Sequence, residues 1–143
     1  MSDNQGMSML KLDRLAFREI HYSRNLEDFP AKTEYEMNFN REISANEDNT
    51  HFIVSLTANV WSKSDRSTNL RITLTGFFCC ECEDDATKQE LVRYNTVAIL
   101  FPYLRSQISL VTVQPDSPPI TFQPVNIISL FKDVDRQENQ QKG

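Results

Sequence analysis

The sequence predicts an α+β fold, in which a four-stranded antiparallel sheet is covered on one face by two main helices. Four segments with the strand-like alternation of apolar and polar residues come first, and segments with helical spacing follow them. Strands that precede helices, instead of alternating with them, are typical of segregated layers. The length of 143 residues predicts one domain with a core of its own.

We expect three parts along the chain. Residues 1–8 read as a disordered N-terminal arm, because they are polar and have no periodicity. Residues 9–135 contain all the periodic segments and form the domain. Residues 136–143 are polar and are expected to be a disordered tail.

The first strand begins near Met9 and changes parity along its length. Leu12 and Leu15 are three residues apart, so an unbroken strand would place them on opposite faces, which indicates a bulge or bend. Residues 23–32 read as a crossing loop. Polar turns join the later strands, which predicts an antiparallel meander. These strands are expected near residues 35–40, 52–61 and 70–80.

Two helices are expected to cover the sheet. In the central one, residues 99–113, apolar side chains recur at helical spacing, and Pro102 suits a first helical position, where a missing N–H costs nothing. A short helix near residues 87–94 precedes it. Asn126 is a good N-cap for the last helix, residues 127–135. The other sheet face is expected to be solvated or partner-bound, and it would carry Thr57, Asn59, Arg71, Thr73 and Thr75.

Composition excludes several classes of protein. The net charge of −5 argues against a nucleic-acid partner, which requires a basic face. No apolar run approaches the length of a membrane span, and the N-terminus has no signal-peptide core. The three cysteines all lie within four positions, so a disulfide framework is not expected and a reducing cytoplasm fits best.

Enzymatic and metal chemistry are not expected either. His21 and His51 are far apart in sequence, and neither belongs to a nucleophile–base motif. The chain has three glycines, too few for a phosphate-binding loop. Cys79, Cys80 and Cys82 would alternate across a strand, so they cannot all reach one zinc ion. We therefore expect no catalytic residue, no metal and no cofactor.

Apolar residues in two loops suggest a groove for extended or unfolded peptide. Leu26 and Phe29 lie in the crossing loop, and Ile120 and Phe122 lie in the proline-rich loop after the central helix, where polar residues are usual. The alternative, that each pair merely tucks its loop onto the core, remains open. Phe131 of the last helix is placed with the groove residues.

The central helix also predicts an oligomer. The apolar stripe of this helix is flanked by further apolar residues, and one sheet face cannot cover all of them. Exposed apolar surface of that size usually marks an interface. We expect a tetramer. The stripe consists of Leu100, Tyr103, Leu104, Ile108 and Val111.

Two motifs identify a resemblance to a known family. ILFPYLR at residues 99–105 and PVNIISLF at residues 124–131, in this order and at this spacing, resemble the SecB protein-export chaperones. LDRLAFREIHY near the start is similar to the first strand of that family. The resemblance covers nearly the whole chain, from Met9 to Phe131.

The resemblance implies a function and an assembly. It implies a homotetramer, a dimer of dimers, that binds unfolded preproteins without ATP and keeps them export-competent. It also implies delivery to the SecA translocase motor through an acidic patch on the open sheet face. The groove of the family lies between the same two loops singled out above.

The match at the SecA-facing surface is uneven. Glu19 stands where the family has an acidic residue, but Ser23 falls where a second one is usual. Asn69 and Arg71 replace an apolar residue and a glutamate, so SecA binding is expected to be weak. The crossing loop also lacks the tryptophan of the family. The sequence therefore leaves open two alternatives to general export: a chaperone dedicated to one client, such as an antitoxin, and a protein-binding adaptor.

Overall fold

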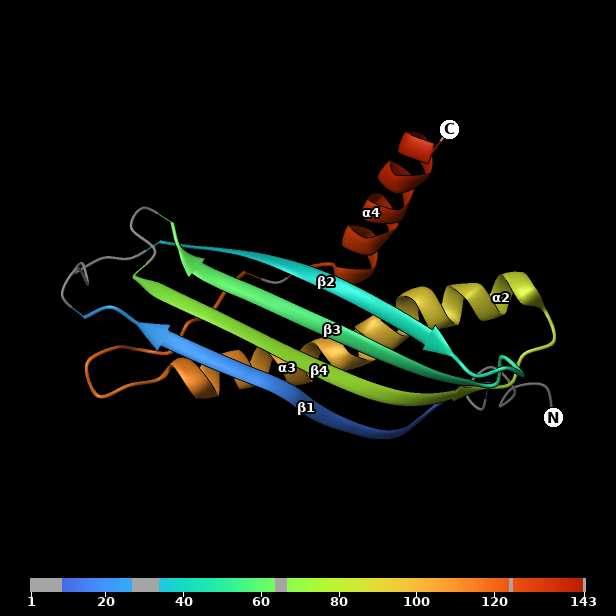
Figure 1. Cartoon of the computed structure of the whole chain (residues 1–143), viewed down its shortest axis with the longest axis horizontal. Helices are drawn as coiled ribbons and strands as arrows, with labels where there is room; N and C mark the ends of the chain where they lie inside the picture. Colours follow the sequence, from blue (N-terminus) through green and yellow to red (C-terminus); the bar gives the residue numbers. More distant parts are fainter. Residues whose placement is uncertain (1–8, 27–33, 64–66, 124, 143) are drawn as a thin grey trace.

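Figure 1 shows the computed structural model of the chain, in which helices cover one face of a single sheet. The structure describes residues 9–26, 34–63, 67–123 and 125–142. The sheet has four antiparallel strands in the order β1-β4-β3-β2, which confirms the predicted α+β architecture. The strands are β1 (Leu10–Arg24), β2 (Tyr35–Ala45), β3 (His51–Ser62) and β4 (Thr68–Cys80).

The strand order confirms the antiparallel meander predicted for the later strands and adds the place of β1. β2, β3 and β4 follow one another as neighbours, but β1 pairs with β4 and stands at the edge opposite to β2. Alternation within each strand fixes which side chains face the core, but it carries no information about which strand is the neighbour. The predicted crossing loop lies partly outside the described residues, and β1 itself continues to Arg24.

β1 contains the irregularity that its sequence predicted. The register against β4 shifts between Leu12 and Arg14 and again between Phe17 and Glu19. The first shift places Leu15 opposite Gly76, on the core side of β4. Each bulge adds one residue to β1, so apolar side chains of both parities reach the same face.

The core lies between the sheet and the helix α3 (Thr96–Thr112). Leu100, Leu104 and Ile108 of α3 are fully buried there. A side chain at Gly76 would not fit, because a Cβ built on it would lie 2.8 Å from Leu100 Cδ2 and 2.6 Å from Phe78 Cε2. Glycine at this position therefore lets α3 approach β4 closely. We use the name open face for the opposite side of the sheet.

The central helix begins earlier than predicted. α2 (Asp85–Glu90), the π-helical turn η2 (Leu91–Asn95) and α3 follow without a break in helical backbone. Pro102 is therefore inside α3 and not at its first position. Its ring removes one helical hydrogen bond, and burial of the neighbouring Leu100, Phe101 and Leu104 keeps the helix formed.

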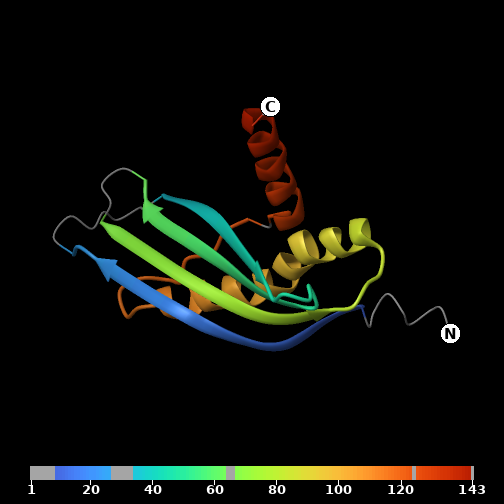
Figure 2. The same ribbon diagram turned by 45° about the vertical axis from the view of Figure 1, so that its right-hand side comes forward.

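The last helix, α4 (Ile127–Lys142), is longer than predicted. Asn126 caps it as expected, with its Oδ1 accepting a hydrogen bond from Ser129 N at 3.0 Å. The helix continues beyond Asp135, whereas the sequence led us to expect a disordered tail from residue 136. In both views α4 extends away from the sheet (Figure 1, Figure 2). The expected N-terminal arm lies outside the described residues.

A buried carboxylate holds α4 in place. Asp135 accepts hydrogen bonds from Arg41 Nη2 at 2.6 Å and from the Tyr94 hydroxyl at 2.7 Å, and Arg93 lies 3.5 Å away. Arg41 also donates to the carbonyl of Arg93 in η2 and stacks over Phe131 of α4. One network thus joins β2, η2 and α4.

Burial alone would raise the pKa of Asp135. The hydrogen bonds from Tyr94 and Arg41, together with the positive charges of Arg41 and Arg93, outweigh burial and lower that pKa below its usual value. Burial and the hydrogen bond to Asp135 raise the pKa of Tyr94. Asp135 is therefore charged and Tyr94 is neutral near pH 7.

Candidate functional site

An open groove of about 970 Å³ separates the start of β2 from the loop that follows α3. β2 is an edge strand, so the groove runs beside a sheet edge. Apolar side chains from both sides line it, and charged side chains stand around them. The lining residues are Glu34, Tyr35, Glu36, Met37, Lys63, Arg105, Ile120, Thr121, Phe122 and Gln123.

The loop wall of the groove is held by side chains of α3. Ser109 Oγ donates to the Ile120 carbonyl at 3.1 Å, and Thr112 Oγ1 accepts from Ile120 N at 2.8 Å. Arg105 Nη2 donates to the Phe122 carbonyl at 3.2 Å. If the loop moved away from α3, its backbone N–H and carbonyl groups would lose these hydrogen-bond partners. This wall of the groove is therefore preformed.

Phe122 of the groove wall packs against two buried aromatic rings that do not themselves line the groove. Phe39 of β2, Phe101 of α3 and Phe122 of the loop form a cluster with ring centroids 5.5–6.3 Å apart. The Arg105 guanidinium lies 5.4 Å from the Phe122 ring centroid. The site therefore offers apolar and cation–π contacts to a bound side chain.

The structure separates the predicted groove residues. Phe122 is half-buried and lines the groove, and Ile120 lines it while also packing in the core. Leu26 is 65% exposed and does not line this groove, and Phe131 is buried beneath Arg41. Phe29 lies outside the described residues. Ile120 is thus tucked onto the core, as the alternative had it, and also lines the groove.

Among the groove residues that sequence reasoning missed are Tyr35, Met37 and Arg105. Tyr35 and Met37 belong to a strand that its alternation predicted, but alternation does not show that a strand stands at a sheet edge. Arg105 falls on the polar side of the predicted helix stripe, where a charge is unremarkable. The next two residues, Ser106 and Gln107, do not indicate a binding role for Arg105 either.

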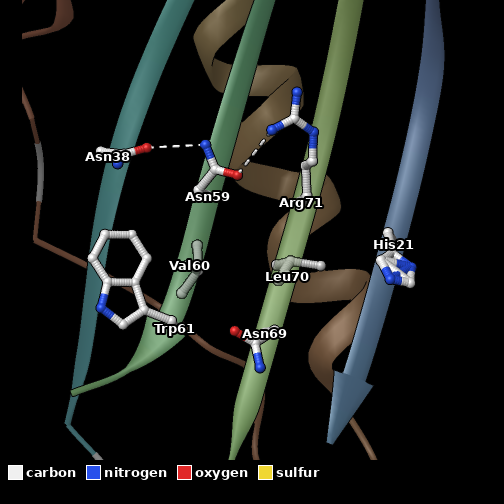
Figure 3. A pocket seen from close by; sticks show the side chains of 8 residues that line it. All are labelled: His21, Asn38, Asn59, Val60, Trp61, Asn69, Leu70 and Arg71. Carbon is white, nitrogen blue, oxygen red and sulfur yellow. Dashed lines mark hydrogen bonds between the residues drawn. The ribbon is translucent and has the colours of Figure 1, made fainter. Parts of the chain in front are cut away.

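On the open face the structure brings the predicted SecA-facing residues together. Ser23 is opposite Asn69, and Arg71 lies 3.3 Å from the Glu19 carboxylate. Arg71 also donates to the amide oxygen of Asn59, at 3.4 Å. Figure 3 shows this region, with Arg71 reaching toward Asn59 in a shallow pocket of the sheet. The only acidic member of the predicted set, Glu19, is therefore paired with a basic one.

The predicted interface stripe divides into two parts. Leu100, Leu104 and Ile108 lie in the core of this chain and are not on its surface. Tyr103 is 51% exposed, and Val111 is half-buried. The outer side of α3 and the residue after it carry the flanking apolar side chains, and Leu110 and Val113 are 67% and 48% exposed.

The cysteines are free thiols, and burial raises the pKa of Cys80. Among the described residues, no group of three or more His, Cys, Asp or Glu side chains is placed to hold a metal ion. None of the helices in the described part of the chain has the length and apolar character needed to cross a membrane.

Comparison with known proteins gives consistent matches. The family model "Preprotein translocase subunit SecB" matches residues 8–140. Uncharacterized protein MJ0357 of Methanocaldococcus jannaschii is 28% identical over 142 residues, which cover 93% of this chain and 90% of that protein. Protein-export protein SecB of Magnetococcus marinus is 28% identical over 121 residues, covering 82% of this chain and 77% of that protein.

One solved structure has the same fold. It is the Mycobacterium tuberculosis Rv1957 SecB-like chaperone in complex with a ChAD peptide from the Rv1956 HigA1 antitoxin. The TM-score is 0.68 at 14% identity, and the match covers 85% of this chain and 94% of that one. Since the family model spans nearly the whole chain and the fold agrees with it, the chain belongs to the SecB family of molecular chaperones.

Proposed function

We propose that this protein is an ATP-independent holdase that binds unfolded preproteins in the groove beside β2 and keeps them export-competent. The observation that carries the proposal is the groove itself, which combines a sheet edge, a preformed loop wall and the half-buried Phe122 ring. Such a groove suits extended apolar segments of many sequences.

A tetramer supplies the affinity that one groove lacks. Each large apolar side chain buried in a groove contributes roughly 1.5–3 kcal/mol, so single contacts are weak. One client that spans several subunits gains avidity. The exposed Tyr103 and Leu110 on the outer side of α3 support assembly through that helix as a dimer of dimers. Free cysteines are consistent with a cytoplasmic site of action.

The Glu19–Arg71 ion pair favours a second candidate function. Because Arg71 neutralises Glu19, this part of the open face is a poor match for a basic partner, so delivery to SecA is expected to be weak. A chaperone dedicated to one client would not need that delivery. The SecB-like chaperone with the same fold was solved with a peptide from an antitoxin, which makes an antitoxin one candidate client.

Aggregation assays test the groove. Thr121 is exposed and lines the groove, so Thr121→Trp would narrow it without disturbing the core. We expect the wild type to suppress aggregation of unrelated unfolded proteins and Thr121→Trp to lose most of that effect. Gln140→Trp, at an exposed position on α4, is the matched control and should behave as wild type.

Two results would contradict the proposal. If Thr121→Trp holds unfolded proteins as well as the wild type, the groove is not the binding site. If the wild type protects only one client, the dedicated chaperone replaces the general holdase. A protein that binds one folded partner and protects no unfolded protein would be an adaptor.

A further inference from the structure

An ion pair ties the loop after α3 to the end of β1. Arg24, the last residue of β1, donates two hydrogen bonds to Asp116, from Nη1 to Oδ1 at 3.1 Å and from Nη2 to Oδ2 at 2.7 Å. Only 11% of the Arg24 side chain is exposed, whereas 56% of the Asp116 side chain is. A contact with two parallel hydrogen bonds fixes the orientation of the carboxylate as well as its position. Asp116 is therefore held at a defined place on the sheet.

The pair lies close to a residue of the groove. Tyr22 of β1 is near both Asp116 and Tyr35, which lines the groove. Burial raises the pKa of the Tyr22 hydroxyl, the Arg24 guanidinium opposes that rise, and these two neighbours add to it. Ile120, four residues after Asp116, begins the loop wall of the groove. The pair therefore joins the sheet to the same loop that supplies this wall.

The chain between Asp116 and the groove wall is stiff. Gln114 and Ser117 exchange two backbone hydrogen bonds of 3.0 Å, which close a tight turn around Asp116. Pro118 and Pro119 follow, and their rings fix φ and leave this backbone few conformations. A displacement of Asp116 is therefore passed on to the groove wall and is not absorbed in between.

The groove wall thus has two kinds of anchor. Hydrogen bonds to Arg105, Ser109 and Thr112 hold it to α3. The Arg24–Asp116 pair holds it to the sheet, and the sheet also provides the opposite wall of the groove through β2. The distance between the two walls therefore depends on this pair.

We propose that Arg24 and Asp116 are positioning residues for client binding, which set the width of the groove through the two prolines. This inference rests on the proposed function of the groove. A wall that is already in place needs no ordering when a client segment binds, so the pair raises the affinity for clients. It does so although neither of its residues lines the groove.

Calorimetric titration measures the effect on client binding. The probe is an apolar peptide that is blocked at both ends and carries no charge, so it has no direct electrostatic contact with the pair. We expect Asp116→Ala to bind this peptide about tenfold more weakly than the wild type does. Asp133→Ala is the matched control, because Asp133 also pairs with an arginine but lies on α4, and it should bind as the wild type does. Unchanged binding by Asp116→Ala would overturn the proposal.

A second variant tests the stiff connection. Pro118→Gly/Pro119→Gly leaves the ion pair in place but makes the connection flexible, so it should weaken peptide binding by a similar factor, about tenfold. Adding Asp116→Ala to it should cause almost no further loss, since both changes break the same coupling. If the two losses multiply instead, the pair does not act through the prolines and the proposal is wrong.

Hydrogen exchange of the Ile120 amide separates this inference from the proposed function. That amide donates to Thr112 Oγ1 at 2.8 Å, so its exchange rate reports how often the groove wall leaves α3. Relative to the amides of β3, which report global unfolding, Asp116→Ala should speed this exchange about tenfold, and Asp133→Ala should not. An unchanged rate would overturn the inference even in a protein that binds the peptide. A faster rate in a protein whose wild type binds no peptide would instead overturn the proposed function, and the role in client binding with it.

Discussion

Two arginine–carboxylate pairs join separate elements of this protein in opposite surroundings. Arg41 and Asp135 are 2.6 Å apart, and only 9% and 11% of their side chains are exposed. Arg71 and Glu19 are 3.3 Å apart, with 52% and 47% exposed. Both pairs join a guanidinium to a carboxylate, and they differ most in burial.

Burial makes the first pair structural and leaves the second available to partners. A buried charge must be fully compensated, and Asp135 has Tyr94 and Arg93 around it besides Arg41. An exposed pair is screened by water and salt, so it adds little to stability. Its charges instead decide which partner the open face can accept.

The largest expected effect is the removal of the buried carboxylate. Asp135→Ala leaves Arg41 without its main partner in a dry site, and we expect it to cost about 3 kcal/mol of unfolding free energy. Asp133→Ala on the same helix is the control, because Asp133 forms only an exposed pair with Arg136 and should cost less than about 1 kcal/mol. Urea denaturation measures both. If the two variants lose the same unfolding free energy, burial of the Asp135 pair adds nothing to stability.

Removing the Tyr94 hydroxyl, the neutral hydrogen-bond partner of Asp135, should cost less unfolding free energy than removing the carboxylate. Tyr94→Phe removes one hydrogen bond to a charged group, which is worth about 1.5 kcal/mol. The ring and its packing are kept, so the change isolates the hydroxyl. Urea denaturation of this variant in the Asp135→Ala background should show almost no further loss, since the acceptor is already gone. If Tyr94→Phe costs as much unfolding free energy in the Asp135→Ala background as in the wild type, the hydroxyl acts through another group.

The stability contributed by the buried pair should depend on pH. The folded-state pKa of Asp135 lies below its usual value of 3.8, so the unfolded chain binds this proton more tightly. The contribution is fully present above that value and is lost as the pH falls through the lowered pKa. The stability gap between the wild type and Asp135→Asn should therefore shrink below pH 3.8 in urea titrations. If this difference in unfolding free energy stays constant below pH 3.8, it would contradict a lowered pKa of Asp135 in the folded protein.

The exposed pair should have the smallest effect on stability. Arg71→Ala is expected to change the unfolding free energy by less than about 1 kcal/mol. Arg71→Glu should instead tighten binding of SecA from the same source, because it replaces a repulsive charge with an acidic one. Titration of SecA against both proteins measures this. Tight binding by the wild type with no gain in Arg71→Glu would show that this charge does not limit the contact.

Local patterns were enough to predict the fold class. The parity change in β1 predicted its bulge, and Asn126 was identified correctly as a cap, because both depend on neighbouring residues. The place of β1 beside β4 was not predictable from alternation, and neither was the inclusion of Pro102 within α3. These features depend on tertiary packing that overrides local preference.

The candidate site was less predictable than the fold. The sequence singled out Phe122 because an aromatic residue in a proline-rich loop is unusual, and it lines the groove. It could not reveal that Tyr35 and Met37 form the opposite wall, since that depends on which strand is at the edge. The Arg41–Asp135 pair joins residues far apart in sequence, and nothing near either residue indicates the other.

The pairing of β1 with β4 has a consequence for synthesis. Leu10 lies opposite Cys80 and Arg24 opposite Thr68, so the whole of β2 and β3 is made between the two partners. β2, β3 and β4 can form through short turns, whereas β1 must wait for the last strand of the sheet. On the ribosome the first strand of this protein is therefore an unpaired, partly apolar segment, in the same condition as the chains we propose it holds.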